Sequence, residues 1–199
     1  MRDCDKEVAR DRDRAIRPVL QVLARLLVER RPLRPVGLAI CVLEIKARGE
    51  IDSSEVYYRR ALDTDPELAP AHHNLAELLS RKKRYGEALD HYRTAADLSP
   101  GEALVHWGMG QTLEVMGSPG QAEQAYKQAI EADPAFPRAY FSMGTLQYGL
   151  RRWSEAKTLF ETFLTLWKGD ELFVKFAEGR IEACESNLER AERAARQSR

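Results

Sequence analysis

The chain has 199 residues, of which 44% are hydrophobic and 31% charged, and its 31 Lys and Arg residues balance 31 Asp and Glu residues. This mixture is typical of a globular protein and excludes the disordered, collagen-like and low-complexity classes. A balanced charge does not favour nonspecific long-range attraction to nucleic acid or anionic lipid.

The N-terminal segment, residues 1–34, carries 10 basic and 6 acidic residues. It lacks the apolar core of a signal peptide, and the apolar stretches near 19–28 and 36–45 are too short to span a bilayer. We expect a helical cap or a degenerate half-repeat here, with Pro18 near the start of a helix. Its basic excess is interpreted as a solvated face, with contact to an acidic partner as the alternative.

The three cysteines, Cys4, Cys41 and Cys184, are far apart and form no CxxC or Cys/His cluster. An odd number without an export signal indicates free thiols in a reducing compartment. We therefore expect a cytoplasmic protein without membrane insertion.

The centre of the chain repeats with a fixed period. Three similar seven-residue segments end in Pro66, Pro100 and Pro134, which are 34 residues apart. Such self-similarity is typical of helical repeat proteins. Placing these prolines at position 32 of each unit predicts four repeats, at residues 35–68, 69–102, 103–136 and 137–170.

Other positions of this frame also recur. Small residues at positions 8, 20 and 27 let two helices approach closely, and one aromatic residue at position 24 fills the space beside them. In chain order, position 8 holds Val42, Ala76, Gly110 and Gly144, position 20 holds Ser54, Ala88, Ala122 and Ala156, position 24 holds Tyr58, Tyr92, Tyr126 and Phe160, and position 27 holds Ala61, Ala95, Ala129 and Phe163.

The third unit contains clear signals for helix ends. Gly117 is expected to end one helix, and Ser118 to cap the next with its side chain while Pro119 occupies the first turn and Gln121 reaches back. Each unit is therefore predicted to be a helix–turn–helix, with a proline ending the second helix.

This pattern resembles the tetratricopeptide repeat family over residues 35–170. The resemblance implies an all-α, right-handed superhelical solenoid of helix–turn–helix repeats with N- and C-terminal capping helices, and residues 171–199 are expected to form the C-terminal cap with a frayed, charged end. The fourth unit departs from the pattern at Phe163 and at Lys168, which replaces the closing proline. We expect its second helix to be longer and its packing on the next helix to be looser.

The resemblance further implies that the first helices line a concave groove through positions 2, 5, 6, 9, 12 and 13. In the first unit this groove is apolar, with Ala39, Ile40 and Leu43, and its occupant could be a partner, the N-terminal helix or another copy of the chain. Trp107 is assigned to the groove, with a packing role as the alternative. The predicted partner-binding residues are His73, Asn74, Glu77 and Arg81 in the second unit, Trp107 and Gln111 in the third, and Arg138, Phe141, Thr145 and Tyr148 in the fourth.

Some family members hold acidic chaperone tails through a carboxylate clamp of Lys, Asn and Arg. In this sequence the corresponding positions are Ala39, Leu43, Asn74, Leu104 and Gly108, so only Asn74 fits, and a shift by one unit also fails. Without several cations a bound carboxylate would lose its hydration uncompensated. The chaperone-tail clamp is therefore predicted to be absent.

No arrangement typical of an enzyme or metal site is found. His72 and His73 are neighbours, so on a helix they point in different directions, and Gly108 and Gly110 lack the preceding strand of a dinucleotide loop. We expect no catalytic residue, metal or cofactor.

Three functions follow from this sequence. The leading hypothesis is a scaffold or adaptor that binds a protein or peptide partner in the concave groove and does not bind nucleic acid. The alternative is a dedicated chaperone or assembly factor that masks apolar segments of a secretion or membrane-complex subunit. The third is a self-assembling structural protein, since the oligomeric state, homo-oligomers included, stays open.

Overall fold

The computed structural model describes residues 51–197, and their side chains from Ser54 onward. The predicted N-terminal cap, the first helix of the first unit and its groove residues lie outside the described residues. Within 51–197 all regular structure is α-helical. The helices are α3 (Ile51–Thr64), α4 (Ala69–Arg81), α5 (Tyr85–Leu98), α6 (Ala103–Val115), α7 (Pro119–Ala132), α8 (Pro137–Gly149), α9 (Trp153–Leu166) and α10 (Glu171–Gln197).

The chain divides into two compact bodies after Ala61. Most of α3 belongs to the first body, and α4–α10 belong to the second. In α3, Ser54, Tyr58 and Ala61 are buried. On its exposed side Arg59 forms an ion pair with Glu55 at 2.9 Å. The buried residues recur every three or four positions, which is the spacing of one helix face.

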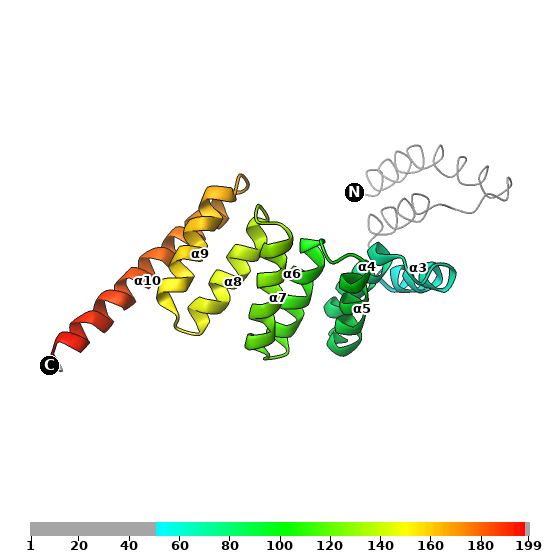
Figure 1. Cartoon of the computed structure of the whole chain (residues 1–199), viewed down its shortest axis with the longest axis horizontal. Helices are drawn as coiled ribbons and strands as arrows, with labels where there is room; N and C mark the ends of the chain where they lie inside the picture. Colours follow the sequence, from blue (N-terminus) through cyan, green and yellow to red (C-terminus); the bar gives the residue numbers. More distant parts are fainter. Residues whose placement is uncertain (1–50, 198–199) are drawn as a thin grey trace, which may run out of the picture. The chain divides into compact units, whose positions relative to one another are not determined.

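In the second body, α4/α5, α6/α7 and α8/α9 form consecutive antiparallel pairs, and α10 packs beside α9 (Figure 1). The first helix of each pair has 13 residues and the second has 14. The aromatic residue at position 24 is buried in each pair, as Tyr92, Tyr126 and Phe160. Each pair therefore closes around one ring, as the repeat pattern predicts.

Glycines let the two helices of a pair approach these rings. A Cβ atom added to Gly110 would lie 2.5 Å from the ring of Tyr126, well inside van der Waals contact. The corresponding distance from Gly144 to Phe160 is 3.2 Å. The small residue at position 8 is thus required by close packing against the aromatic residue at position 24.

The turn inside each pair uses a left-handed residue at position 15. This residue is Lys83, Gly117 and Arg151 in the three pairs, with φ of 61°, 74° and 59°. The backbone N–H of Gly117 donates to Glu114 O at 3.0 Å, which helps to end α6. Gly117 therefore ends α6 as predicted, and the other two turns place side chains in a conformation that favours glycine.

The start of α7 differs in part from the prediction. Ser118 is the N-cap residue and Pro119 begins the helix, but the Ser118 side chain makes no capping hydrogen bond. The predicted side-chain cap is wrong, because the Ser118 backbone has ψ of 65° and not the more extended value of a typical N-cap.

A recurring hydrogen bond from position 4 ties α4, α6 and α8 to the proline carbonyl in the turn that precedes each of them. His72 Nε2 lies 3.0 Å from Pro66 O, and His106 Nε2 lies 3.0 Å from Pro100 O. Tyr140 Oη donates to Pro134 O at the same distance. A carbonyl only accepts, so both imidazoles carry their proton on Nε2.

Two expectations for the fourth repeat, residues 137–170, are wrong. The second helix, α9, has 14 residues, as α5 and α7 do, so the expected lengthening is wrong. Its packing on α10 is also not loose, because Phe163 is 1% exposed in a cluster with Ala177 and Cys184. The small residues of α10 leave room for the Phe163 ring, which stacks on Trp167 at 5.3 Å between centroids.

The final helix, α10, begins where Asp170 Oδ1 accepts a hydrogen bond from the Leu172 N–H at 2.8 Å. If the 34-residue frame is continued into α10, its position 8 is Glu178, which is exposed. The same position is Ala76 in α4, Gly110 in α6 and Gly144 in α8. The C-terminal half of α10 runs past α9 (Figure 1), and every residue from Glu189 to Gln197 is exposed. A polar residue at this position is what a capping helix requires.

Candidate functional site

The first helices α4, α6, α8 and α10 lie side by side and form the candidate site. Ser80 on α4 and Thr112 on α6 are joined through their hydroxyls at 2.9 Å. Trp107 Nε1 on α6 donates to Ser142 Oγ on α8, also at 2.9 Å. Phe141 on α8 meets Phe176 on α10 with centroids 5.3 Å apart. These side chains link each first helix to the next, and all of them except Thr112 are at groove positions. We call this surface the first-helix face.

The α4 part of the first-helix face is polar. Arg81 forms an ion pair with Glu77 at 2.6 Å, so these two predicted residues engage each other. The ring of His73 lies 5.9 Å from that of Tyr92. Asn74 is half-buried, and no hydrogen bond within the described residues uses its amide. Asn74 thus keeps both a donor and an acceptor for another molecule.

Trp107 lies between α6 and α8 and is half-buried. Besides its bond to Ser142, its ring meets the edge of Phe136 at 6.1 Å and the guanidinium of Arg138 at 5.5 Å. Trp107 consequently has a packing role and a partly accessible ring at the same time. Arg138 is exposed and has no ion pair with a described carboxylate.

Gln111 is one turn from Trp107 on α6 and is exposed. Its amide makes no hydrogen bond within residues 51–197. With Asn74 and Arg138 it gives the first-helix face three polar groups, on three successive first helices, that form no hydrogen bond or ion pair with the rest of the described chain.

The α8 part of the face is aromatic and largely engaged by neighbours. Phe141 contacts Phe163, Phe173 and Phe176 with centroids 5.1, 5.5 and 5.3 Å away. Thr145 Oγ1 donates to the Phe141 carbonyl at 2.9 Å, so its hydroxyl serves its own helix.

Tyr148 packs edge-on against Trp153 at 5.0 Å. The Arg180 guanidinium lies over its ring at 4.4 Å from the centroid. The outer part of the aromatic surface therefore belongs to α10, which the sequence interpretation treated as a cap only.

Three residues of α10 were missed as site residues: Leu172, Phe176 and Arg180. Leu172 is 69% exposed and Phe176 is 40% exposed, although both are large and apolar. Extending the frame of 34 residues past 170 would have placed Leu172 and Phe176 at groove positions 2 and 6. They were missed because that segment was interpreted as a cap.

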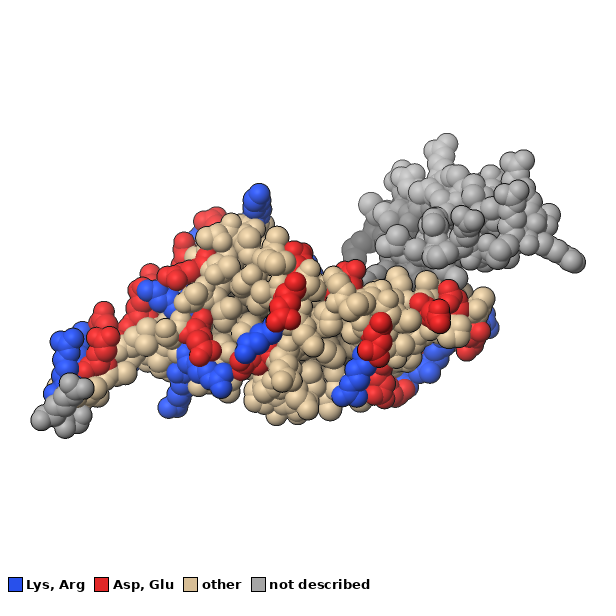
Figure 2. Space-filling model, viewed as in Figure 1, with Lys and Arg blue, Asp and Glu red and all other residues tan. Residues whose placement is uncertain are grey.

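The electrostatics of the described surface are mixed in sign. Figure 2 shows acidic and basic side chains interspersed over the face in view, and several form i,i+4 pairs, such as Lys127 with Glu123 at 2.6 Å. Burial, followed by the nearby Glu77, raises the pKa of Tyr92 to about 12. Burial and Glu114 also raise the pKa of Tyr126, whose hydroxyl donates to that carboxylate at 2.9 Å. Both tyrosines are thus neutral, packed groups at physiological pH.

The part of the chain that the structure describes contains no cluster of three or more His, Cys, Asp or Glu side chains suited to a metal ion. None of its helices combines the length and apolarity needed to cross a bilayer.

Apart from the first-helix face, a hollow of about 460 Å³ lies between α5 and α7 on the side of the second helices. Leu89, Met109, Leu113 and Ala125 contribute its apolar lining, and Gln124 and Gln128 are among its polar residues. Ala125 occupies the position that His91 has in the preceding pair. This hollow is a competing surface for any binding experiment.

Paired helices around a buried ring, joined at a fixed interval, define a helical repeat protein with an accessible face of first helices. The tetratricopeptide repeat family matches at residues 67–135 and again at 108–171. Together the two matches span more than half of the chain. The chain belongs to the tetratricopeptide repeat family.

Solved structures share this fold. PilF of Pseudomonas aeruginosa aligns with a TM-score of 0.65 at 21% identity, over 90% of this chain and 91% of PilF. YrrB, a TPR protein with an unusual peptide-binding site, aligns with a TM-score of 0.63 at 18% identity, over 77% of each chain. The first TPR of Spaghetti, bound to an HSP90 peptide, aligns with a TM-score of 0.55 at 19% identity, over 60% of this chain and 92% of that one. No curated protein matches the sequence.

Proposed function

We propose that this protein is a scaffold or adaptor that binds a segment of a partner protein along the first-helix face, in the cytoplasm. The observation that carries the proposal is the set of three polar groups, Asn74, Gln111 and Arg138, on the same face as the half-buried Trp107. Amide groups can bond a partner backbone, while the ring supplies contact area. Peptide binding by the related folds of YrrB and Spaghetti supports this use of the fold.

The partner differs from a chaperone tail in this proposal. Gly108 stands at one of the positions where the carboxylate clamp has a cation, and a Cβ there would lie 2.6 Å from the Tyr92 hydroxyl. A long basic side chain therefore has no space at that position. The partner is instead held by amide hydrogen bonds and by contact with Trp107.

A photo-crosslinking experiment tests the proposal. Benzoylphenylalanine is introduced at Gln111 on the first-helix face or at Gln124 beside the hollow of α5 and α7, and crosslinked proteins are identified from native extract. We expect one partner to crosslink from position 111 and not from 124. Crosslinking from 124 alone would reject the first-helix face and assign binding to the hollow.

A triple variant, Asn74→Ala/Gln111→Ala/Arg138→Ala, provides the second measurement. Its matched control replaces three exposed residues of α7, as Gln121→Ala/Gln124→Ala/Gln128→Ala. Capture of the crosslinked partner should fall at least tenfold with the first variant and stay unchanged with the second, while circular dichroism shows equal helicity. Equal capture by both variants would contradict the proposal.

A further inference from the structure

One glycine of α10 has no packing role. Among glycines in the interior of the described helices, Gly108, Gly110 and Gly144 lie against the rings of Tyr92, Tyr126 and Phe160. A Cβ added to Gly179 meets no atom within 4 Å. Glycine in a helix interior is less stable than alanine, so packing within the described chain does not account for this residue.

Gly179 lies on the exposed apolar side of α10. Leu172, Phe176 and Arg180 follow one another at intervals of four residues, and Gly179 is three residues after Phe176, so all four share one helix face. Leu172 and Phe176 are 69% and 40% exposed. A large apolar surface beside an unobstructed glycine is suited to close approach by another backbone.

Arg180 adds a charge at the end of this surface. Its guanidinium lies 4.4 Å from the centroid of Tyr148 and 4.9 Å from that of Phe176, so two rings orient it. No carboxylate of the described residues pairs with it, and none of their oxygens accepts a hydrogen bond from it. Because the rings take no hydrogen bond from it and no described oxygen does, the N–H groups of Arg180 stay available for a carboxylate.

We propose that Leu172, Phe176, Gly179 and Arg180 form a docking subsite for a partner segment that carries an apolar side chain next to an Asp or Glu. The apolar side chain packs on Leu172 and Phe176, the partner backbone approaches at Gly179, and the carboxylate bonds Arg180. The inference rests on the proposed function, because it extends the first-helix face onto α10 and defines the chemistry of the partner there.

A random sixteen-residue peptide display library is the probe. The full chain and its Arg180→Glu variant serve as separate baits. Peptides selected by the unchanged protein should be enriched in Asp or Glu close to Leu, Phe or Met, and the reversed charge should shift the enrichment to Lys or Arg. Selection without acidic enrichment, or with the same enrichment on both baits, would overturn the subsite.

Gly179→Ala supplies a readout that a merely structural role would not move. The alanine should raise the thermal midpoint, because it favours the helix, and yet weaken binding of a selected peptide at least threefold, because its methyl group obstructs the backbone. Gly120→Ala is the control, since Gly120 also has open space but lies on α7 away from this face. Tighter binding by Gly179→Ala would contradict the proposal.

Further outcomes separate the two proposals. If selected peptides need Asn74, Gln111 and Arg138 but bind Arg180→Glu unchanged, the proposed function stands and the α10 subsite fails. If the unchanged protein selects no peptide, both fail. If light scattering shows a dimer that Arg180→Glu dissociates, a second copy occupies this face and the acidic segment is rejected.

Discussion

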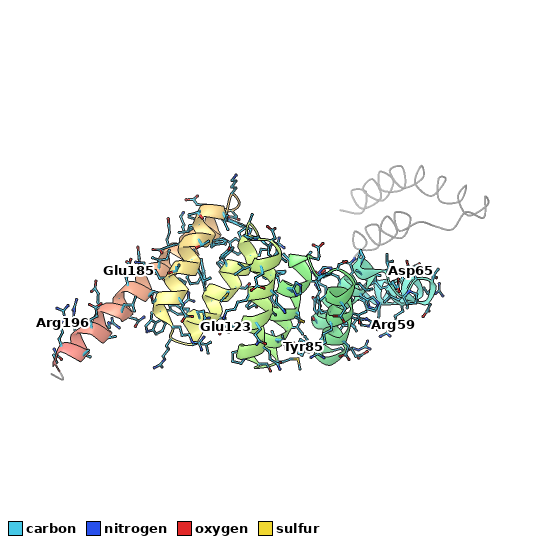
Figure 3. The ribbon with its side chains drawn as sticks, viewed as in Figure 1. Arg59, Asp65, Tyr85, Glu123, Glu185 and Arg196 are labelled. Carbon is cyan, nitrogen blue, oxygen red and sulfur yellow. The ribbon has the colours of Figure 1, made fainter. Side chains whose placement is uncertain are left out.

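Arg152 and Glu123 form an ion pair that joins two repeats. Arg152 Nη1, just before α9, donates to Glu123 Oε2 on α7 at 2.8 Å, and Figure 3 labels Glu123 at this position. Lys127 Nζ donates to the other Glu123 oxygen at 2.6 Å. These bonds, that of Lys127 first, lower the pKa of the Glu123 carboxyl. The pair therefore ties the stability of the joint between α7 and α9 to pH.

The first prediction concerns acid stability. A carboxyl whose pKa is lowered by folding stabilises the fold above its unfolded pKa of about 4.3, and this contribution is lost as pH falls through the lower folded pKa. Glu123→Gln should thus unfold at lower urea concentration than the unchanged protein at pH 7, and the difference should shrink toward pH 3. Urea titrations at both pH values measure it, and a constant difference would contradict the assignment.

The second prediction compares two glycines that face aromatic rings. Gly110→Ala places a methyl group 2.5 Å from the buried Tyr126 ring, whereas Gly144→Ala leaves 3.2 Å to Phe160. Overpacking should outweigh the helix preference of alanine at Gly110 and lower the free energy of unfolding by about 1–2 kcal/mol. Gly144→Ala should change it by less than about 1 kcal/mol. Equal urea midpoints for the two variants would reject the packing argument.

The third prediction uses the left-handed turns. Lys83 and Arg151 have φ of 61° and 59°, which costs a residue with a Cβ atom about 1 kcal/mol. Lys83→Gly and Arg151→Gly should each raise the free energy of unfolding by up to about 1 kcal/mol, and Gly117→Ala should lower it by about as much. Thermal unfolding followed by circular dichroism checks the signs, and stabilisation by Gly117→Ala would be the opposite result.

The fourth prediction concerns the thiol of Cys184. This residue is fully buried, and burial raises the pKa of its thiol, so little reactive thiolate is accessible. Iodoacetamide should modify Cys184 at least a hundredfold more slowly in the native protein than in urea. Mass spectrometry of the peptide that contains Cys184 separates it from the other cysteines. Rapid modification of the native protein would show that α10 separates from α9.

The sequence was informative about the helix pairs because close packing restricts residue size. Ala88, Ala122 and Ala156 at position 20 and the ring at position 24 are buried, as the spacing predicts. The prediction of loose packing failed because small residues on one helix can make room for a large residue on another. Phe163 looked too large for position 27, but Ala177 and Cys184 on another helix provide its space, and sequence spacing alone does not reveal such pairs.

The candidate site was less accessible to sequence reasoning. A groove position says which helix face a residue occupies, but not whether its hydrogen bonds are already used. Glu77 and Arg81 bond each other, whereas Asn74 has no described hydrogen-bonding partner, and the sequence pattern is the same for all three. Arg180 was missed because its position over Tyr148 depends on the packing of α10.

The hydrogen bond from position 4 to the proline carbonyl has a consequence for the growth of such proteins. His106 to Pro100 and Tyr140 to Pro134 form the same joint at both ends of residues 103–136. A duplicated copy of this segment would carry the donor for the joint before it and the acceptor for the joint after it. Lengthening the array by gene duplication would then require no new hydrogen-bonding residues at the junctions between repeats.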